Sequence, residues 1–383
     1  MKIAIIGANE FQNKLILKCK ENNVETHVFA WEDGAIGKEY CDYFYPISIV
    51  EKEKILEQCE KIGIDGILSI GSDLAMLTVN YVAEELNLIG NTTESTILST
   101  DKFEMRKAFL NNNVSCPKFM IVKENIKDLK NVEIQFPCIV KPTDRSGSRG
   151  VTKVEKYDEL DIAIKKALSE SFNKKVILEQ YIGGKEYSME FISDNGNHTF
   201  LAITEKFTTG SPNFIEKAHL QPARINNEIL ERAIQIAKDG LNALMVKNGA
   251  SHVEIKIENN DIFIIEIGAR MGGDFIGSDL VKLSTGIDFT ELVLYKCLDK
   301  EIKVNRLYNK HSFVYFIFDE NDILKVKNNY NILKPYIVEK NINLKDKYNK
   351  VTDSSNRNGY ILFQFDQYDE FEKIEKILLK NKF

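Results

Sequence analysis

The sequence contains no long hydrophobic run. Nowhere in its 383 residues does a stretch approach the roughly 20 consecutive apolar residues that a membrane-spanning helix needs. The N-terminus, MKIAIIGA, is patterned like a strand and lacks the long apolar segment of a signal peptide. We therefore expect no membrane association and no secretion, and we predict a cytoplasmic location.

The chain is also poor in cysteine, and its six cysteines form no CxxC pair and have no nearby histidine. This spacing favours reduced, structural thiols in the cytosol over disulfides or a zinc site. The six residues are Cys19, Cys41, Cys59, Cys116, Cys138 and Cys297.

An excess of positive charge is absent. The chain has 51 basic and 57 acidic residues, so its net charge is 51 − 57 = −6, which gives no support for nucleic acid as the main partner. The hydrophobic content of 43% and the charged content of 28% are typical of globular proteins. At this length we expect two or three domains.

The first hundred residues alternate short apolar runs with amphipathic stretches. This order predicts a parallel sheet with helices on its faces, a Rossmann-like domain over residues 1–100. The expected strands cover residues 2–6, 26–30 and 66–70, and the expected helices cover 13–22, 51–62 and 74–86. Because function in such sheets gathers past the strand ends, Asn9, Glu10, Ser72 and Asp73 are candidates for a substrate mouth. Turn and cap roles explain these four residues equally well.

A second domain is expected over residues 101–302. Asp101 is placed to cap a helix over 102–112, and Cys116-Pro117 then opens a lobe over about 117–185. Later strands at 252–257 and 262–267 are joined by the turn sequence Glu258–Asp261, which predicts a hairpin. The remaining strands are expected at 138–141, 151–154, 176–181, 187–193 and 199–206, and the helices at 157–171 and 226–246. The fold class is therefore α/β and α+β.

Residues 303–383 contain two apolar, strand-like runs, at 313–318 and 360–365, and a final amphipathic helix. We expect them to form a small β-rich, α+β C-terminal subdomain that packs over the active site.

A lysine ends one apolar strand and a loop rich in glycine and serine follows it. Lys141 precedes Ser146, Gly147, Ser148 and Gly150. Backbone amides of such a loop converge on phosphate, and the lysine adds a point charge. The GxxxxGK[ST] order of a P-loop is absent, and a plain surface hairpin is the alternative.

Two carboxylates flank the predicted hairpin turn. Glu266 interrupts the apolar run Ile262–Ile267, and Glu254 lies on the preceding strand. If the two strands pair, these side chains could lie together and hold Mg²⁺, which prefers hard oxygen ligands. A buried salt bridge for Glu266 and a solvated strand face for Glu254 are the alternatives. Four residues further on, Arg270 could clamp a phosphoryl group, act as a structural partner of Glu266, or do both.

The segment LEQYIGGKE combines a strand end, a glycine turn and two acids. Backbone groups of Gln180, Tyr181 and Ile182 could read an adenine edge, and a carboxylate could hold ribose hydroxyls. Taken alone, this segment would be an ordinary hairpin.

In this order the pieces resemble the ATP-grasp superfamily. The resemblance begins with the Rossmann-like domain and continues through Asp101-Lys102, IVKPTDRSGSRGV, LEQYIGGKEYSMEF and HVEIKIENNDIFIIEIGARMGG. It covers roughly residues 1–300 and is similar to the carboxylate–amine ligases, relatives of biotin carboxylase and carbamoyl-phosphate synthetase. It implies a two-lobed ATP-grasp fold after the first domain.

The resemblance also implies roles for individual residues. ATP phosphates would meet Lys102, Lys141 and the lid loop Ser146–Gly150; adenine would meet Glu179 and the backbone at Gln180–Ile182; and ribose would meet Glu186. Glu254 and Glu266 would hold Mg²⁺, with Mn²⁺ as an alternative ion, and Arg270 would stabilise the acyl phosphate. Asn9, Asp73, His219, Arg270 and Gly273 are the candidate substrate residues, although His219 could equally be a lone surface histidine.

Two positions depart from the family pattern. Many relatives have Asn where this chain has Gly268, so one metal site is expected to be weaker or completed by water. The loop Gly7–Gln12 keeps a single glycine of the dinucleotide fingerprint, which argues against NAD binding.

The expected reaction is amide bond formation through an acyl phosphate, with release of ADP and phosphate. It requires no side-chain nucleophile, and the sequence shows no Ser/His/Asp or Cys/His constellation. The substrates would be a small carboxylate and an amine from amino acids, peptides or amino sugars, and a homodimer is expected by analogy. The alternatives are a carboxylase that uses carboxyphosphate, an NAD(P)-dependent oxidoreductase and a catalytically silent nucleotide-binding protein.

Overall fold

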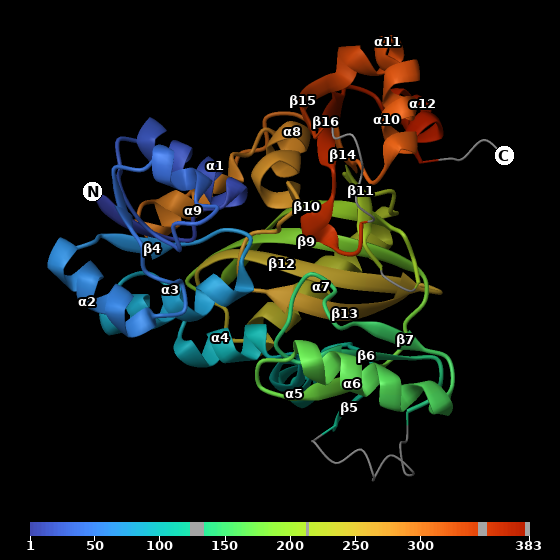
Figure 1. Ribbon diagram of the computed structural model, residues 1–383, viewed down its shortest axis with the longest axis horizontal. Helices are drawn as coiled ribbons and strands as arrows, with labels where there is room; N and C mark the ends of the chain where they lie inside the picture. The colour runs from blue at the N-terminus through green and yellow to red at the C-terminus, as the bar shows by residue number, and fades with distance from the viewer. Residues whose placement is uncertain (123–133, 212–213, 344–350, 380–383) are drawn as a thin grey trace.

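The fold was analysed in a computed structural model, which describes residues 1–122, 134–211, 214–343 and 351–379. An N-terminal domain lies beside a long central sheet, a small lobe lies against one side of that sheet, and the C-terminal elements lie on the opposite side (Figure 1). None of the described helices is both long and apolar enough to cross a membrane.

The N-terminal domain is a parallel sheet in the order β3-β2-β1-β4. Its strands are β1 (Lys2–Ile6), β2 (Glu25–Phe29), β3 (Tyr43–Tyr45) and β4 (Gly66–Leu68), and its helices are α1 (Glu10–Glu21), α2 (Lys52–Ile62), α3 (Asp73–Glu85) and α4 (Thr93–Thr100). The Rossmann-like prediction is confirmed, but β3 and α4 were missed. The three-residue β3 is too short to show a period. Helix α1 begins earlier than expected because the Asn9 side chain caps it by accepting from the Gln12 amide.

The lobe is an antiparallel sheet in the order β5-β8-β6-β7, and helix α6 packs on it. Its elements are β5 (Phe119–Val122), β6 (Cys138–Pro142), β7 (Thr152–Val154), α6 (Leu160–Glu170) and β8 (Val176–Gln180). Helix α5 (Lys102–Asn111) leads into it, and Asp101 caps α5 by accepting from the amides of Phe103 and Glu104, as predicted. The loop between β6 and β7 carries the glycine and serine sequence and faces the central sheet.

One eight-stranded sheet runs through the rest of the molecule, in the order β13-β12-β9-β10-β11-β14-β16-β15. Its strands are β9 (Lys185–Asp194), β10 (Asn197–Thr208), β11 (Glu216–Gln221), β12 (Gly249–Glu258), β13 (Asp261–Gly268), β14 (His311–Phe316), β15 (Ile337–Ile342) and β16 (Gly359–Phe365). The helices are α7 (Asn227–Ala243), α8 (Val281–Thr285), α9 (Phe289–Cys297), α10 (Glu320–Asn328), α11 (Tyr330–Leu333) and α12 (Tyr368–Leu378).

The domain boundaries expected at residues 100 and 302 are less sharp than the sequence suggested. Strand β11 pairs with β14, so the C-terminal strands extend the central sheet and do not form a sheet of their own. Helix α9 packs against α1 and completes the hydrophobic core of the N-terminal domain. The C-terminal helices do bury a separate apolar cluster against β14 and β16.

The predicted hairpin of β12 and β13 is confirmed. Asn259 and Asn260 form its turn with φ values of 51° and 70°, a left-handed conformation that Asn tolerates. Helix α7 packs closely beneath β13, because a Cβ on Gly240 would lie 2.7 Å from Ile264 Cδ1 and 2.8 Å from Ile267 Cδ1. Each of these fully buried isoleucines contributes about 1.5–3 kcal/mol. Close packing against α7 therefore fixes the position of β13, the strand that carries Glu266.

Candidate active site

Two adjoining cavities lie between the lobe, the central sheet and the N-terminal domain. The first is lined by nearly all the residues predicted to bind ATP and metal: Lys102, Lys141, Ser146, Gly147, Ser148, Glu179, Gln180, Tyr181, Ile182, Glu186, Glu254, Glu266 and Arg270. The second shares Ser146, Gly147, Glu254 and Arg270 with the first and adds Asp73, His219 and Gly273. The fold thus brings together residues from three separate parts of the chain.

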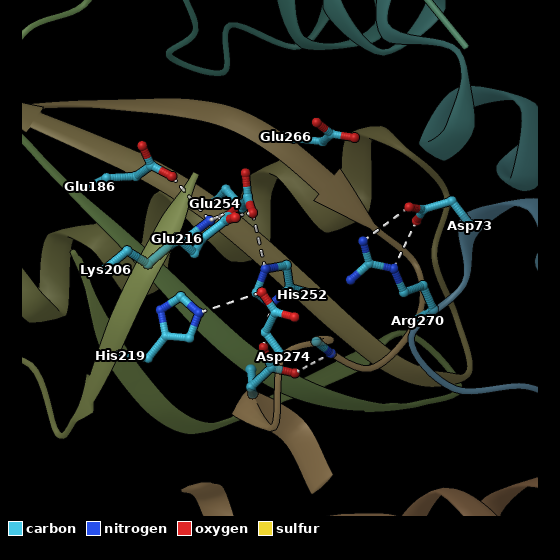
Figure 2. Close-up of polar contacts among 12 residues, drawn as sticks. Asp73, Glu186, Lys206, Glu216, His219, His252, Glu254, Glu266, Arg270 and Asp274 are labelled. Atoms are coloured by element: carbon cyan, nitrogen blue, oxygen red, sulfur yellow. Dashed lines mark hydrogen bonds and ion pairs between the residues drawn. The ribbon is translucent and has the colours of Figure 1, made fainter. Parts of the chain in front are cut away.

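Glu254 and Glu266 are direct cross-strand partners in the β12–β13 hairpin. A cation holds each carboxylate. Lys206 Nζ lies 2.7 Å from Glu254 (Figure 2), and Lys102 Nζ lies 2.8 Å from Glu266. Burial raises the pKa of Glu254, but Lys206 and His252 outweigh burial and hold that pKa well below its usual range. Glu254 is therefore ionised at neutral pH.

These two carboxylates fit a magnesium ion that also contacts phosphate. Among the residues that the structure describes, no group of three or more His, Cys, Asp or Glu side chains could hold a metal alone. Mg²⁺ is commonly bound through one or two carboxylates, with substrate phosphates and water completing its octahedron. Glu254 and Glu266 would hold the ion, and their retained solvent access toward the cavity suits that role.

Lys102 links the loop between β6 and β7 to this hairpin. Its ammonium donates to the Arg145 carbonyl and to Glu266, both at 2.8 Å, from the first turn of α5. Burial lowers the pKa of Lys102, but Glu266 more than compensates and raises it overall. Lys102 therefore places a positive charge between the β6–β7 loop and Glu266.

Glu179 lies in a buried ion-pair cluster that the sequence did not indicate. One carboxylate oxygen is 2.7 Å from Lys141 Nζ, and the other is 2.9 Å from Arg106 Nε, whose alignment is not that of a hydrogen bond. Burial raises the pKa of Glu179, but Arg106 and Lys141 lower it below its usual value. Its contact with adenine stays a prediction, and the backbone at Gln180–Ile182 lines the same cavity.

Arg270 forms its ion pair with Asp73. The expectation from the sequence that Glu266 is its structural partner is therefore wrong. Arg270 Nε and Nη2 donate to the two oxygens of Asp73 at 2.8 and 3.0 Å (Figure 2). Gly268 makes this possible, because a Cβ there would lie 2.9 Å from Asp73 Oδ1 and 3.0 Å from Arg270 Cζ. Gly268 thereby leaves room for the ion pair between Arg270 and Asp73.

His219 is not a surface histidine. It is fully buried and lies against Phe316. Within the described part of the chain, neither ring nitrogen has a hydrogen-bond partner, and Asp274 Oδ2 is 3.9 Å from Nε2. Burial lowers the pKa of His219, although Asp274 acts in the opposite direction. Asp274 is in turn held by Arg357, which the C-terminal region supplies.

Three predicted residues do not line either cavity. Asn9 serves as the α1 cap, while its neighbour Glu10 lines the second cavity. Ser72 caps α3 by accepting from the Ala75 amide, while its neighbour Asp73 lines the second cavity. Gly150 closes the loop against the lobe: its φ is +73°, and a Cβ would lie 2.9 Å from Pro142 Cγ.

Sequence reasoning missed two central residues. Lys206 is buried among three acids, with Glu186 at 3.0 Å, Glu216 at 3.7 Å and Glu254 at 2.7 Å. His252 lies two residues before Glu254 on the same strand face, and this period of two was a usable signal. Burial lowers the pKa of His252, but Glu190 and hydrogen bonds to Glu190 and Glu254 raise it to about 9.

Comparison with known proteins agrees with this architecture. Residues 134–279 match the family model described as the ATP-grasp domain. An L-amino acid ligase structure from Bacillus licheniformis superposes with a TM-score of 0.83 at 22% identity, covering 98% of this chain and 96% of that one. N5-carboxyaminoimidazole synthetase from Staphylococcus aureus, complexed with ADP, gives 0.80 at 16% identity, covering 99% and 97%. The predicted ATP-grasp fold is confirmed.

The curated relatives match this chain over a smaller part of their own length. The carbamoyl phosphate synthase large chain of Thermoanaerobacter sp. (strain X514) is 24% identical over 269 residues, which is 68% of this chain and 24% of that protein. Alanine–anticapsin ligase of Bacillus subtilis is 26% identical over 310 residues, covering 70% of this chain and 64% of the ligase. The chain thus spans about a quarter of the synthase chain and less than two thirds of the ligase.

Proposed function

We propose that this protein is an ADP-forming ligase that activates a carboxylate with ATP and joins it to an amine. The observation that carries this proposal is the pairing of Glu254 with Glu266 in one cavity with Lys102, Lys141 and Arg270. Two acids and three cations around one cavity suit a nucleoside triphosphate with its metal ion. Phosphoryl transfer in such a site needs no covalent nucleophile from the protein.

The residues supply alignment and charge. Lys102 and Lys141 would bind phosphate oxygens, and the backbone of Ser146–Ser148 would cover them. A metal ion on Glu254 and Glu266 would neutralise the charge of the phosphates during transfer. Arg270 stands where the two cavities meet, so it can contact both the transferred phosphoryl group and the carboxylate that receives it.

The bond changes follow from this arrangement. A substrate carboxylate oxygen attacks the γ-phosphorus, the bond to the β,γ-bridging oxygen breaks, and ADP leaves. The amine nitrogen then attacks the acyl carbon, phosphate departs with the bonding electrons, and the amine proton passes to solvent. Closure of the glycine loop would keep water from the acyl phosphate.

The names of two relatives support amide formation as the favoured reaction. One is named as an L-amino acid ligase and another as an alanine–anticapsin ligase. A carboxylase that makes carboxyphosphate from bicarbonate is the second candidate, because N5-carboxyaminoimidazole synthetase shares the fold over almost the whole chain. Small molecules are the expected partners in both cases. A homodimer and a cytoplasmic location stay predictions.

The test is a substrate matrix. The protein is incubated with ATP, Mg²⁺ and pairs of carboxylates and amines, and ADP and phosphate should form only with a matching pair. Glu266→Gln should abolish this release, whereas Glu231→Gln, on the exposed face of α7, should not. AMP and pyrophosphate as products would refute the acyl-phosphate route. Bicarbonate-dependent turnover would favour the carboxylase, and NADH binding without ATP binding would favour an oxidoreductase.

A further inference from the structure

Glu190 lies in a buried polar cluster that the proposed reaction does not use. It belongs to β9, the strand next to β12, and it is completely buried. Its register partner on β12 is His252, and its carboxylate contacts His252 Nδ1. A carboxylate removed from water costs several kcal/mol unless it is paired, so the position of Glu190 depends on these contacts.

His252 connects Glu190 to a metal-binding carboxylate. Its Nε2 lies 3.3 Å from Glu254 Oε1, and its Nδ1 contacts Glu190 (Figure 2 shows the contact with Glu254). Each ring nitrogen of His252 thus contacts one carboxylate. One rigid ring thereby fixes the distance between the interior acid and the cavity acid.

The second oxygen of Glu190 holds the loop that follows the other metal strand. Glu190 Oε2 accepts from the Gly272 amide at 2.9 Å. A side chain at Gly272 has no room, because its Cβ would lie 2.5 Å from Glu190 Oε1 and 2.7 Å from His252 Nδ1. The neighbouring Gly273 lines the second cavity. Glu190 therefore joins β12 to the glycine loop beyond β13.

We propose that Glu190 and His252 are positioning residues that orient Glu254 for the metal ion and hold the Met271–Gly273 loop in register with it. This inference rests on the proposed function. Ligating carboxylates depend on their outer hydrogen-bond partners, whose loss commonly weakens metal affinity or activity about 10–100-fold. A cluster that served packing alone would leave metal affinity unchanged when its hydrogen bonds were altered.

The experiment measures metal binding directly. Mg²⁺ or Mn²⁺ is titrated into the complex of the full chain with ADP by calorimetry, and ADP binding is measured separately in EDTA. For Glu190→Gln and His252→Gln we expect metal affinity to fall about 10–100-fold, with metal-free ADP affinity within about twofold of wild type. Because both residues share the Glu190–His252 contact, the loss of metal affinity in the double variant should be smaller than the sum of the two single losses.

His198→Gln is the matched control. His198 is a buried histidine on β10 of the same sheet, bound to Ser193 and Asn242 and outside both cavities, so its variant should keep wild-type metal affinity. Unchanged metal affinity in Glu190→Gln and His252→Gln, or additive losses in the double variant, would overturn the inference. If Glu190→Gln does not fold, as thermal unfolding would show, His252→Gln alone decides the question.

Glu254→Gln separates this inference from the proposed function. If Glu254→Gln itself binds metal normally, the metal site of the proposed function fails. If Glu254→Gln loses metal affinity while Glu190→Gln and His252→Gln keep it, only the positioning role fails.

Discussion

Asp73 holds Arg270 through two parallel hydrogen bonds, at 2.8 and 3.0 Å, although the two residues lie 197 positions apart. Asp73 is the first residue of α3 in the N-terminal domain, and Arg270 follows β13 of the central sheet. Burial raises the pKa of Asp73, but Arg270 lowers it below its usual value, so the pair is ionic. The N-terminal domain thus sets the direction of the proposed phosphoryl-binding arginine.

Asp73→Asn should therefore damage catalysis more than nucleotide binding. Asparagine keeps the size of the side chain but has no negative charge and only one acceptor oxygen. It therefore cannot bind both guanidinium donors, and Arg270 loses its fixed orientation. Misplacement of a catalytic group by about 1 Å can cost about 10²-fold in rate, and we expect a loss of that order in kcat. Steady-state ADP release measures kcat, and calorimetry should show unchanged ADP affinity. A wild-type kcat would show that Arg270 does not need Asp73.

Gly268→Ala tests the same pair from the other side. The new Cβ would lie within about 3 Å of both partners, which can move only by giving up their bidentate geometry. Because the displaced atoms are side-chain ends, we expect stability to change by less than about 1 kcal/mol while kcat falls about tenfold or more. Urea unfolding and steady-state kinetics measure the two quantities. Equal turnover in Gly268→Ala and wild type would contradict the claim that Gly268 makes room for the pair.

Lys206→Met should destabilise the chain in the absence of metal and nucleotide. The substitution leaves the carboxylates of Glu186, Glu216 and Glu254 without their shared cation. Removal of one partner of a buried ion pair costs about 3–5 kcal/mol, and we expect the lower end, about 3 kcal/mol, because the three acids keep some solvent access. Urea unfolding in EDTA measures this. Lys185→Met, on an exposed lysine of the neighbouring strand, should stay within about 0.5 kcal/mol of wild type.

The parts of the site that the sequence predicted are local ones. The hairpin that pairs Glu254 with Glu266 needs only a turn and a period of two, and the Asp101 cap needs three neighbouring residues. The contacts that complete the site are long-range. Lys206 lies 48 residues from Glu254, and Arg106 lies 73 residues from Glu179 (179 − 106), distances at which a single sequence carries no pairing signal.

The missed strands have a similar explanation. Strand β15 is largely exposed at the sheet edge, so it lacks the alternation of buried and exposed side chains that marks a strand. The join between β11 and β14 depends on two segments about 90 residues apart, so the shared sheet could not be inferred from apolar runs alone.

His219 should make the protein less stable in mild acid. Its pKa is lowered mainly by burial, with Lys206 contributing, against the opposing effects of Asp274 and Glu216. In the unfolded chain the pKa of His219 is near 6.5, so below that pH the unfolded chain binds a proton that the native state does not bind. Stability is therefore lost as pH falls through about 6.5 toward the lower native pKa. The slope from one such group cannot exceed about 1.4 kcal/mol per pH unit. In His219→Gln, whose other histidines are unchanged, we expect the free energy of unfolding to fall about 1 kcal/mol less between pH 7.5 and 5.5 than in wild type. Urea unfolding at both pH values measures this difference, and equal losses in the two proteins would show that His219 titrates normally in the folded state.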